Sequence, residues 1–304
     1  MKVGEENMPS ERLFYKPNKY LINPENMCPN TTPVDYLFAV YSAAGYEKTR
    51  RVIRSTWGKE IKRSSGNKLI FLFGKPNTSD LQNTLARESL RYGDIVQEDF
   101  VDSYRNLTVK TVMMLRWVTL HCPQARFVVK MDDDSFLNVA NFYRAMHERP
   151  EDAIYGQVIH RYAPERRSDN KWYISYDDEP RDVFPDFIAG PMYVIGGRVV
   201  HRLYTATGLV KPFPNEDVYL TGKCAERAGV SITHLPGVHF LKLPTPCDYK
   251  KAIYVHQVTA EEISSLWYTL NRLEYKCHNL LFSLHICYCG SVDPSTEARE
   301  VSLI

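Results

Sequence analysis

Residues 126–138 read RFVVKMDDDSFLN, an apolar run that ends abruptly in three aspartates. The run Arg126–Met131 has the length of a buried strand. A buried strand would not tolerate unpaired carboxylates, so Asp132, Asp133 and Asp134 must emerge at its carboxyl end. Two acids separated by one residue can both face a hard cation, and Mg²⁺ or Mn²⁺ held there could bridge a diphosphate. The alternative is a solvated acidic turn that caps the next helix.

Apolar runs of strand length alternate with helical patterns through the first half of the chain. The expected strands are Tyr36–Ser42, Lys68–Phe73 and Asp94–Val96. The helices expected after them, in the same order, are Lys48–Trp57, Asp80–Gly93 and Ser103–His121. Strands that alternate with helices predict an α/β fold, with a mostly parallel sheet covered on both faces. Such sheets bind ligands outside the carboxyl ends of their strands, which is where the three aspartates are expected.

The overall composition narrows the class of protein. With 304 residues and 44% hydrophobic residues, the chain can form one sizeable α/β domain or two small ones. Its 38 basic and 36 acidic residues leave a net charge of +2, which gives no electrostatic footprint for nucleic acid. No stretch approaches the roughly 18–20 apolar residues that cross a bilayer. The chain is therefore soluble as encoded, or a luminal portion whose anchor is missing.

Cysteines and glycosylation signals point to an oxidising compartment. The seven cysteines match no zinc framework, and their odd number leaves at least one thiol unpaired or paired with another chain. N-glycosylation sequons occur at Asn30, Asn77 and Asn106. Disulfides and glycans together would suit the secretory lumen.

A second acidic pair, Glu216-Asp217, lies in the stretch PFPNEDVYLTGKCAERAG. Asp217 is expected to begin a helix that runs to about Ala228, and an acid at that position is often only a cap. A catalytic role gains weight when the two acidic sites are considered together. Gly190, within the apolar stretch FIAGPMYVIGG, could let the backbone approach a bound sugar closely. The alternative there is a strand entry followed by a turn.

Several of these stretches resemble, in order and spacing, the β-1,3-glycosyltransferases, a family that includes β-1,3-galactosyltransferases and β-1,3-N-acetylglucosaminyltransferases. The matching stretches are RRVIRSTWG (50–58), EDFVDSYRNLTVKT (98–111), LRWVTLHCP (115–123), FVVKMDDDSFLN (127–138), KWYISYDDEPRDVFPDFIAGPMYVI (171–195), NEDVYLTGKCAERAG (215–229) and YVHQVT (254–259). The resemblance covers roughly residues 35–270.

The resemblance implies a GT-A type, Rossmann-like nucleotide-sugar-binding domain over residues 34–275, between an irregular lead-in (1–33) and a C-terminal tail (276–304). It implies a UDP-sugar donor, a divalent metal that is usually Mn²⁺, a membrane anchor not seen in this chain, and a place in the Golgi lumen. Two departures stand out. Ile188 occupies a position that is commonly cysteine in the family, so one family disulfide is expected to be absent. The helix after Glu216-Asp217 is one residue longer than usual.

For the chemistry, Asp134 is expected to hold the metal with help from Asp132, which could instead contact the ribose. His256 matches the family's C-terminal metal-binding histidine; His239 is the competitor, and a solvated strand-end histidine is the alternative. Asp217 is the expected base for the acceptor hydroxyl, because direct displacement needs one carboxylate base and no covalent nucleophile. Glu216 would orient Asp217 or contact the acceptor.

The remaining site residues are expected to bind the two substrates. Arg50 and Arg54 lie four residues apart on one helical face, which fits donor recognition or a pair of surface salt bridges equally well. The resemblance implies that Asp102 and Lys110 lie near the donor's nucleotide, and Asp133 and Gly190 are also expected on the donor side. Trp172 and Tyr173 are candidates for stacking on the acceptor sugar, with an apolar surface patch as the alternative.

The sequence thus predicts an inverting, metal-dependent hexosyltransferase that moves a sugar from a UDP-sugar to the 3-hydroxyl of a glycan on a glycoprotein or glycolipid. Galactose is favoured as the donor sugar, because Glu-Asp-Val and KWY resemble the galactosyl branch more closely; N-acetylglucosamine is the alternative. Two other classes remain open, a metal-dependent phosphate-ester hydrolase and a non-catalytic sugar-binding module on the same fold.

Overall fold

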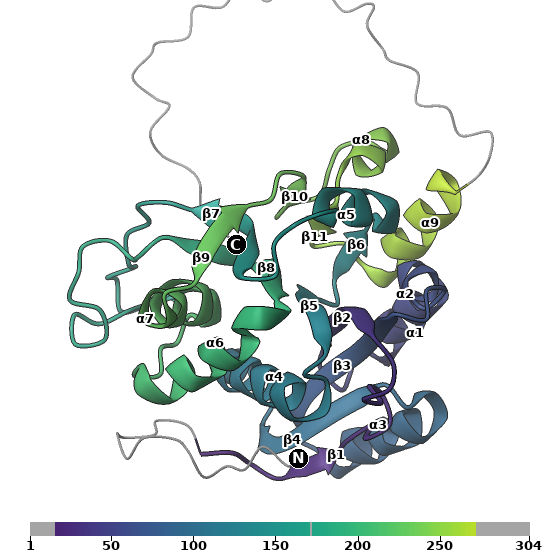
Figure 1. Ribbon diagram of the computed structural model, residues 1–304, viewed down its shortest axis with the longest axis horizontal. Coiled ribbons are helices and arrows are strands. Elements are labelled where there is room, and N and C mark those ends of the chain that lie inside the picture. The colour runs from purple at the N-terminus through teal and green to yellow at the C-terminus, as the bar shows by residue number, and fades with distance from the viewer. Residues whose placement is uncertain (1–15, 171, 272–304) are drawn as a thin grey trace, which may run out of the picture.

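An eight-stranded sheet runs through the centre of the molecule in the order β1-β4-β3-β2-β5-β8-β7-β9 (Figure 1). The computed structural model describes residues 16–170 and 172–271. The strands of this sheet are β1 (Tyr20–Ile22), β2 (Val34–Tyr41), β3 (Asn67–Lys75), β4 (Ile95–Val101), β5 (Ala125–Asp132), β7 (Ala153–Ile159), β8 (Phe187–Gly196) and β9 (Ser231–His234).

The sheet is mixed in direction. Strands β4, β3, β2 and β5 are parallel to one another, and β7 is parallel to β9. Strand β8 runs antiparallel to both β5 and β7, and β1 runs antiparallel to β4. The predicted α/β class is confirmed, and the parallel strands that the alternating pattern indicated form the first half of the sheet.

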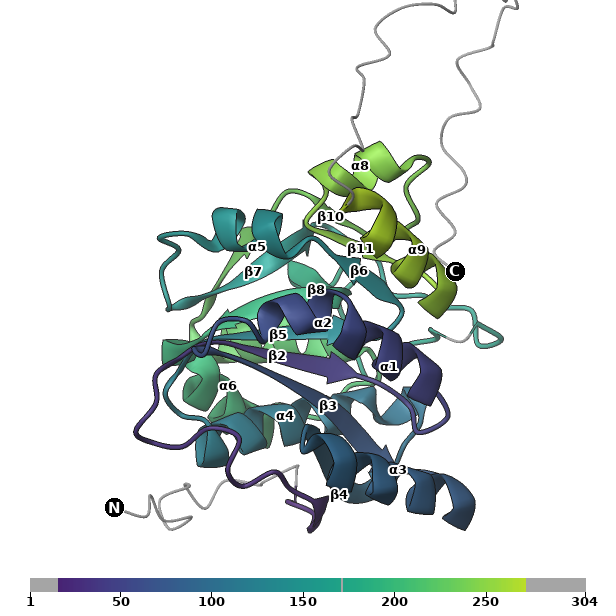
Figure 2. The same cartoon turned by 90° about the vertical axis from the view of Figure 1, so that its right-hand side faces the viewer.

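Helices cover both faces of the sheet (Figure 2). Along β2, Leu37 and Ala39 face the side of α4 and α6, whereas Phe38 and Val40 face the side of α1 and α2. This alternation follows from the period of two in a strand that is buried on both faces. The helices are α1 (Glu47–Ser55), α2 (Trp57–Ile61), α3 (Ser79–Tyr92), α4 (Leu107–His121), α5 (Val139–Met146), α6 (Gly197–Leu209), α7 (Ala225–Ala228), α8 (Pro246–Lys251) and α9 (Ala260–Leu270).

Several elements differ in detail from the sequence prediction. The first helix is interrupted at Thr56, whose backbone leaves the helical region, so the predicted helix becomes α1 and α2. Strand β4 extends to Val101, well beyond the predicted Val96. The helix expected after Asp217 begins as a π-helix, η3 (Val218–Cys224), before α7. The resemblance places one extra residue in this segment, and the wider π-helix is a form that accommodates one.

A small second sheet, β10-β11-β6, brings the C-terminal half of the chain to the carboxyl end of β5. It consists of β6 (Ser135–Leu137), β10 (Val238–His239) and β11 (Tyr254–His256). Strand β11 pairs antiparallel with β6, and His256 lies opposite Ser135. The residue after the three aspartates is therefore paired directly with His256.

The N-terminal lead-in, expected to be irregular up to residue 33, contributes to the domain. Strand β1 pairs with the edge strand β4, and Cys28 forms a disulfide with Cys122 at the end of α4. In the described part of this segment, residues 16–33, the three-residue edge strand is too short to leave a pattern in the sequence. Cys247 is also disulfide-bonded, and Cys224 is a buried free thiol. The predicted tail, 276–304, lies outside the described residues.

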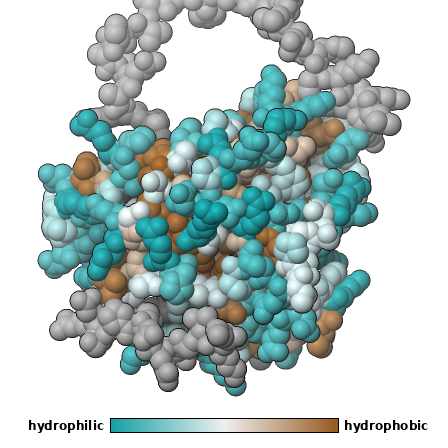
Figure 3. All heavy atoms as spheres, viewed as in Figure 1, coloured by the Kyte–Doolittle hydropathy of each residue, from teal (hydrophilic) through white to brown (hydrophobic). Residues whose placement is uncertain are grey.

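The face of the molecule seen in Figure 3 is largely hydrophilic, with apolar side chains in small scattered groups. Among the described residues, no helix is both long enough and apolar enough to cross a membrane. Asn30 and Asn77 are exposed, whereas Asn106 is half-buried and its amide donates to the carbonyl of Val101.

The disulfide should stabilise the domain by closing a long loop, because its cysteines are 94 residues apart. Replacing Cys28 and Cys122 together with serine should lower the free energy of unfolding by about 2–4 kcal/mol. Denaturant unfolding measures this, with Cys224→Ala as a control that removes a sulfur and leaves the disulfide in place. Equal unfolding midpoints for the double variant and the unmodified protein would contradict the expectation.

Candidate active site

Asp132, Asp134 and His256 form one group at the carboxyl end of β5. One ligand atom from each residue can be chosen so that all three lie within 4.8 Å of one another. The imidazole Nε2 of His256 is 3.0 Å from Oδ1 of Asp134 and 3.6 Å from Oδ2 of Asp132. The pairing of β11 with β6 creates this proximity, since it sets His256 beside the turn that carries both acids.

The competing histidine, His239, is not part of this group. It lies on β10, where its register partner is Val255. Burial lowers the pKa of His256, but the hydrogen bond that its imidazole donates to Asp134 and the charges of Asp134 and Asp132 outweigh burial, and the net pKa is raised. The imidazole therefore sits in a negative field of the kind that also attracts a cation.

Asp133, the middle acid, points away from this group. It is buried, and the hydroxyl of Ser42 donates to its Oδ2 at 2.5 Å. Burial raises its pKa to about 7, although the bond from Ser42 lowers it. The expected donor contact of Asp133 is therefore not supported, because its carboxylate is turned toward the end of β2. It holds the acidic turn in place instead.

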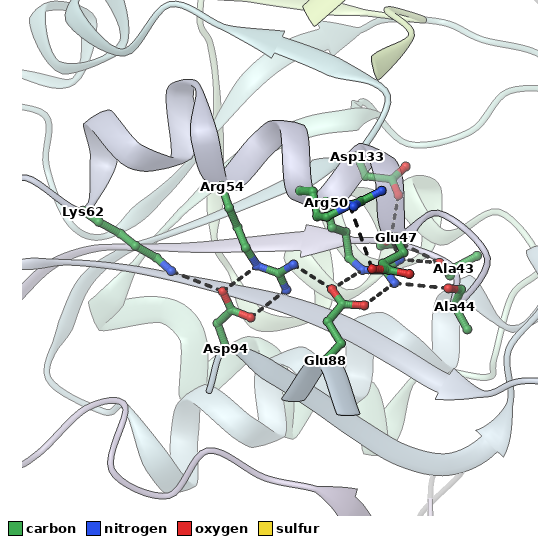
Figure 4. A network of polar contacts seen from close by, with 11 residues as sticks. Ala43, Ala44, Glu47, Arg50, Arg54, Lys62, Glu88, Asp94 and Asp133 are labelled. Carbon is green, nitrogen blue, oxygen red and sulfur yellow. Dashed lines mark hydrogen bonds and ion pairs between the residues drawn. The ribbon is translucent and has the colours of Figure 1, made fainter. Parts of the chain in front are cut away.

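Behind Asp133 lies the buried guanidinium of Arg50 (Figure 4). It donates from Nε and Nη2 to the carboxylate of Glu88, from Nη1 to Ser42 Oγ and the Ala43 carbonyl, and from Nη2 to the Ala44 carbonyl. A guanidinium has five N–H donors, and these five bonds use all of them. Arg50 therefore fixes the chain segment that follows β2 and, through Ser42, the orientation of Asp133.

Arg54 extends this network toward the amino ends of the parallel strands, where Asp94 directly precedes β4. It donates to Glu88 and bidentately to Asp94, which Lys62 also contacts (Figure 4). The donor recognition expected of Arg50 and Arg54 is thus not supported, and neither is the alternative of surface salt bridges. Both guanidiniums are buried and already paired with carboxylates, so neither has a free face for a donor.

Asp102 and Lys110 form an ion pair of 2.7 Å where β4 ends. The ammonium of Lys110 also donates to the Ser42 carbonyl at 3.0 Å, which joins this pair to the end of β2. Within the described residues, the buried Oδ2 of Asp102 has no hydrogen-bond partner. A buried carboxylate oxygen that lacks a donor is an acceptor site for an incoming hydroxyl or N–H group.

Asp217 sits at the start of η3 beside the first residues of β8. Its Oδ1 accepts the N–H of Val218 at 2.8 Å, and its Oδ2 accepts the N–H of Gly190 at 3.1 Å. Burial raises its pKa, and these two N–H groups and the charge of Lys130 offset the rise only in part. A Cβ at Gly190 would lie 3.3 Å from Oδ2 of Asp217, so glycine leaves room for this carboxylate.

Glu216 is directed into the core. The hydroxyls of Thr111 and Tyr193 donate to its Oε1 at 2.7 and 2.5 Å, and Tyr41 bonds to Thr111 in turn. Its expected contact with an acceptor is not supported, because Glu216 is buried and its Oε1 accepts hydrogen bonds from both of these hydroxyls. Its position in the chain, next to Asp217, makes it an anchor for the start of η3.

Lys130 was missed by the sequence analysis, although a lysine in the apolar run RFVVKM requires a partner. Its buried ammonium donates to Asp132 Oδ1 at 2.8 Å and to the Gly190 carbonyl at 2.6 Å. Gly190 in turn donates its N–H to Asp217. The lysine therefore links the acid at the end of β5 to the segment that carries Asp217.

The aromatic pair is placed at the rim. The indole N–H of Trp172 donates to the hydroxyl of Tyr104 at 2.9 Å, and Tyr173 is exposed. Burial raises the pKa of Tyr104, the hydrogen bond from Trp172 lowers it, and the charges of Asp217 and Asp132 raise it further. Trp172 therefore contacts Tyr104, which the sequence analysis did not single out.

Comparison with known proteins identifies the family of the chain. The galactosyltransferase family model matches residues 48–236. Mouse beta-1,3-galactosyltransferase 1 is 33% identical over 256 residues, covering 82% of this chain and 77% of that protein. Human lactosylceramide 1,3-N-acetyl-beta-D-glucosaminyltransferase is 35% identical over 266 residues, covering 82% and 69%. The apo structure of the bifunctional glycosyltransferase WbbM has a TM-score of 0.43 at 10% identity, covering 75% of this chain and 46% of that one.

The family model and the sequence relatives together identify a glycosyltransferase. The chain belongs to the galactosyltransferase family, whose model matches more than half of its length.

The ion pairs of Glu88 give a stability prediction. Burial raises the pKa of Glu88, but its bonds to Arg50 and Arg54 outweigh burial, and the net pKa is lowered. Glu88→Gln should lower the free energy of unfolding by about 3 kcal/mol at neutral pH, because two buried guanidiniums lose their charged partner. The difference should shrink as the pH falls through the folded-state pKa of Glu88.

Denaturant unfolding of both proteins at several pH values measures this effect. Glu261→Gln, which breaks an exposed ion pair with Lys48, is the matched control and should leave the midpoint nearly unchanged. If the two variants unfold at the same midpoint, the buried network does not stabilise the fold as described.

Proposed function

We propose that this chain is an inverting, metal-dependent transferase that moves galactose from UDP-galactose to the 3-hydroxyl of an acceptor sugar, forming a β-1,3 linkage. The observation that carries the proposal is the placement of two different acidic sites at the ends of neighbouring strands. Asp132 and Asp134 follow β5, Asp217 adjoins the start of β8, and Met131 of β5 pairs with Met192 of β8.

The donor set of the first site fits a divalent cation. Carboxylate oxygens suit Mg²⁺ and Mn²⁺, and the imidazole of His256 adds a softer ligand that favours Mn²⁺. Asp132, Asp134 and His256 would hold the metal, and the metal would supply charge neutralisation for the departing diphosphate. Asp133 and Arg50 support this arrangement from behind, since both are buried and directed toward the end of β2.

Asp217 is assigned as the base that accepts the proton of the attacking hydroxyl. Two backbone N–H groups fix its carboxylate, and its raised pKa makes it a better proton acceptor than an ordinary aspartate. Lys130 keeps the base and the metal-site acid in a fixed relation through Gly190. Asp102, whose Oδ2 has no hydrogen-bond partner in the described part of the chain, is assigned to the donor side, and Trp172 and Tyr173 to the acceptor side.

N-acetylglucosamine is the second candidate for the transferred sugar. It is favoured by the 35% identity to a protein named as an N-acetylglucosaminyltransferase. The family model and the first relative, a named β-1,3-galactosyltransferase, favour galactose. The acceptor is proposed to be a glycan on a glycoprotein or glycolipid.

We further propose that the protein works in the lumen of the Golgi apparatus. The disulfide between Cys28 and Cys122 and the exposed sequons at Asn30 and Asn77 support an oxidising compartment with access to glycosylation.

The direct test is transfer itself. Incubation with Mn²⁺ and a panel of UDP-sugars, over simple acceptors with terminal N-acetylglucosamine, N-acetylgalactosamine or galactose, should give a mass increase of one hexose from UDP-galactose only. EDTA should abolish the product, and Asp134→Ala should lower the rate about 100-fold or more. UDP release that is equally fast without acceptor would instead identify a hydrolase.

The pH profile tests the role of Asp217. The base acts deprotonated, so kcat should fall as the pH drops through its folded-state pKa, which is raised above that of an ordinary aspartate. Asp217→Asn should lower kcat by about 10²–10⁴-fold. Protonation of His256 should also lower the activity at low pH, because it weakens metal binding. The pH at which this loss occurs should shift with the Mn²⁺ concentration, whereas the loss caused by protonation of Asp217 should not. Substantial activity in Asp217→Asn would exclude this residue as the base.

A further inference from the structure

The two oxygens of Asp132 are engaged in different ways. Oδ1 accepts a hydrogen bond from the ammonium of Lys130 at 2.8 Å, whereas Oδ2 faces His256 Nε2 at 3.6 Å. The oxygen held by Lys130 is turned toward the core, and the other is turned toward the candidate metal ligands. Because Oδ1 already accepts a hydrogen bond from a charged ammonium, it is a poor ligand for a cation that Oδ2 binds on the other side of the carboxylate.

Lys130 is itself held rigidly. Its ammonium also donates to the Gly190 carbonyl at 2.6 Å and lies 4.5 Å from the ring centroid of Tyr41 and 5.7 Å from that of Tyr193. Only 4% of its side chain is exposed.

We propose that Lys130 is a positioning residue that limits Asp132 to one-oxygen coordination and so makes the metal site selective for Mn²⁺ or Mg²⁺ over Ca²⁺. The inference rests on the proposed metal site and adds a second source of selectivity to the preference for Mn²⁺ that His256 already gives.

The selectivity follows from the coordination that each cation requires. Ca²⁺ takes six to eight oxygens at about 2.3–2.6 Å and commonly uses both oxygens of a carboxylate. Smaller octahedral cations use single carboxylate oxygens and fill the remaining positions with water or phosphate. With Oδ1 of Asp132 held by Lys130, this carboxylate offers a cation one oxygen and not the bidentate pair that Ca²⁺ commonly uses. Without the ammonium, the carboxylate could present both oxygens.

The test uses the full chain and the metals alone. Binding of Mn²⁺ is followed through the electron paramagnetic resonance signal of the free ion, with Ca²⁺ as competitor, which yields the ratio of the two dissociation constants. The unmodified protein should prefer Mn²⁺ by about tenfold or more, and Lys130→Met should lower this preference about tenfold. Lys130→Gln, which keeps a donor without the charge, should fall between them.

Lys62→Met is the control. This variant removes the same charge from an ion pair with Asp94, which directly precedes β4 and so lies at the amino end of the strands, away from the metal site. The ratio of dissociation constants should therefore stay unchanged. Circular dichroism establishes that each variant is folded. A role confined to folding would lower the affinity for both ions together and would not move the ratio.

Equal affinity of the unmodified protein for Mn²⁺ and Ca²⁺ would overturn the inference, whether or not the variants fold. An unchanged ratio in a folded Lys130→Met or Lys130→Gln protein would overturn it as well. If the unmodified protein bound neither ion, the metal site of the proposed function would fail and this inference with it, so the two failures are distinguishable.

Discussion

The structure of the site depends on one buried ion pair, between Arg50 of α1 and Glu88 of α3. The guanidinium satisfies all of its donors on Glu88 and on the segment that follows β2, and Ser42 passes this constraint to Asp133. A charge buried this deeply is tolerated only when it is paired and fully hydrogen-bonded. The helices of one face and the acidic turn are thereby fixed relative to each other.

Around this constraint, cations and acids alternate across the ends of β2, β4 and β5. Lys110 pairs with Asp102, and Lys130 pairs with Asp132, while Glu216 accepts hydrogen bonds from the hydroxyls of Thr111 and Tyr193. Each ammonium also donates to a backbone carbonyl, of Ser42 and Gly190 respectively. This arrangement lets several carboxylates crowd one edge of a sheet while Asp134 and Asp217 remain available for chemistry. The two ammonium groups offset part of the negative charge at this end of the sheet, which suits both the proposed binding of an anionic donor and the proposed role of Asp217 as an ionised proton acceptor.

Much of the fold could be predicted because its signals are local. The run RFVVKM before Asp132 identifies a buried strand and the edge at which the acids emerge, and the order of motifs identifies the family. Burial of Arg50 could not be predicted in this way. A spacing of four residues puts Arg50 and Arg54 on one helix face, but whether that face meets solvent depends on Glu88, which is 38 residues beyond Arg50. The position of His256 likewise depends on the pairing of β11 with β6, and Asp133 could not be distinguished from its neighbours until Ser42 was placed beside it.

The central claim is that Asp132, Asp134 and His256 form the metal centre of a transferase whose base is Asp217. Anomalous X-ray scattering from crystals grown with Mn²⁺ and UDP would test it most directly. The account predicts one strong manganese peak among these three side chains, in contact with the diphosphate, and Asp217 unligated beside the donor. A manganese peak elsewhere, or UDP bound with its diphosphate away from Asp132 and Asp134, would contradict it.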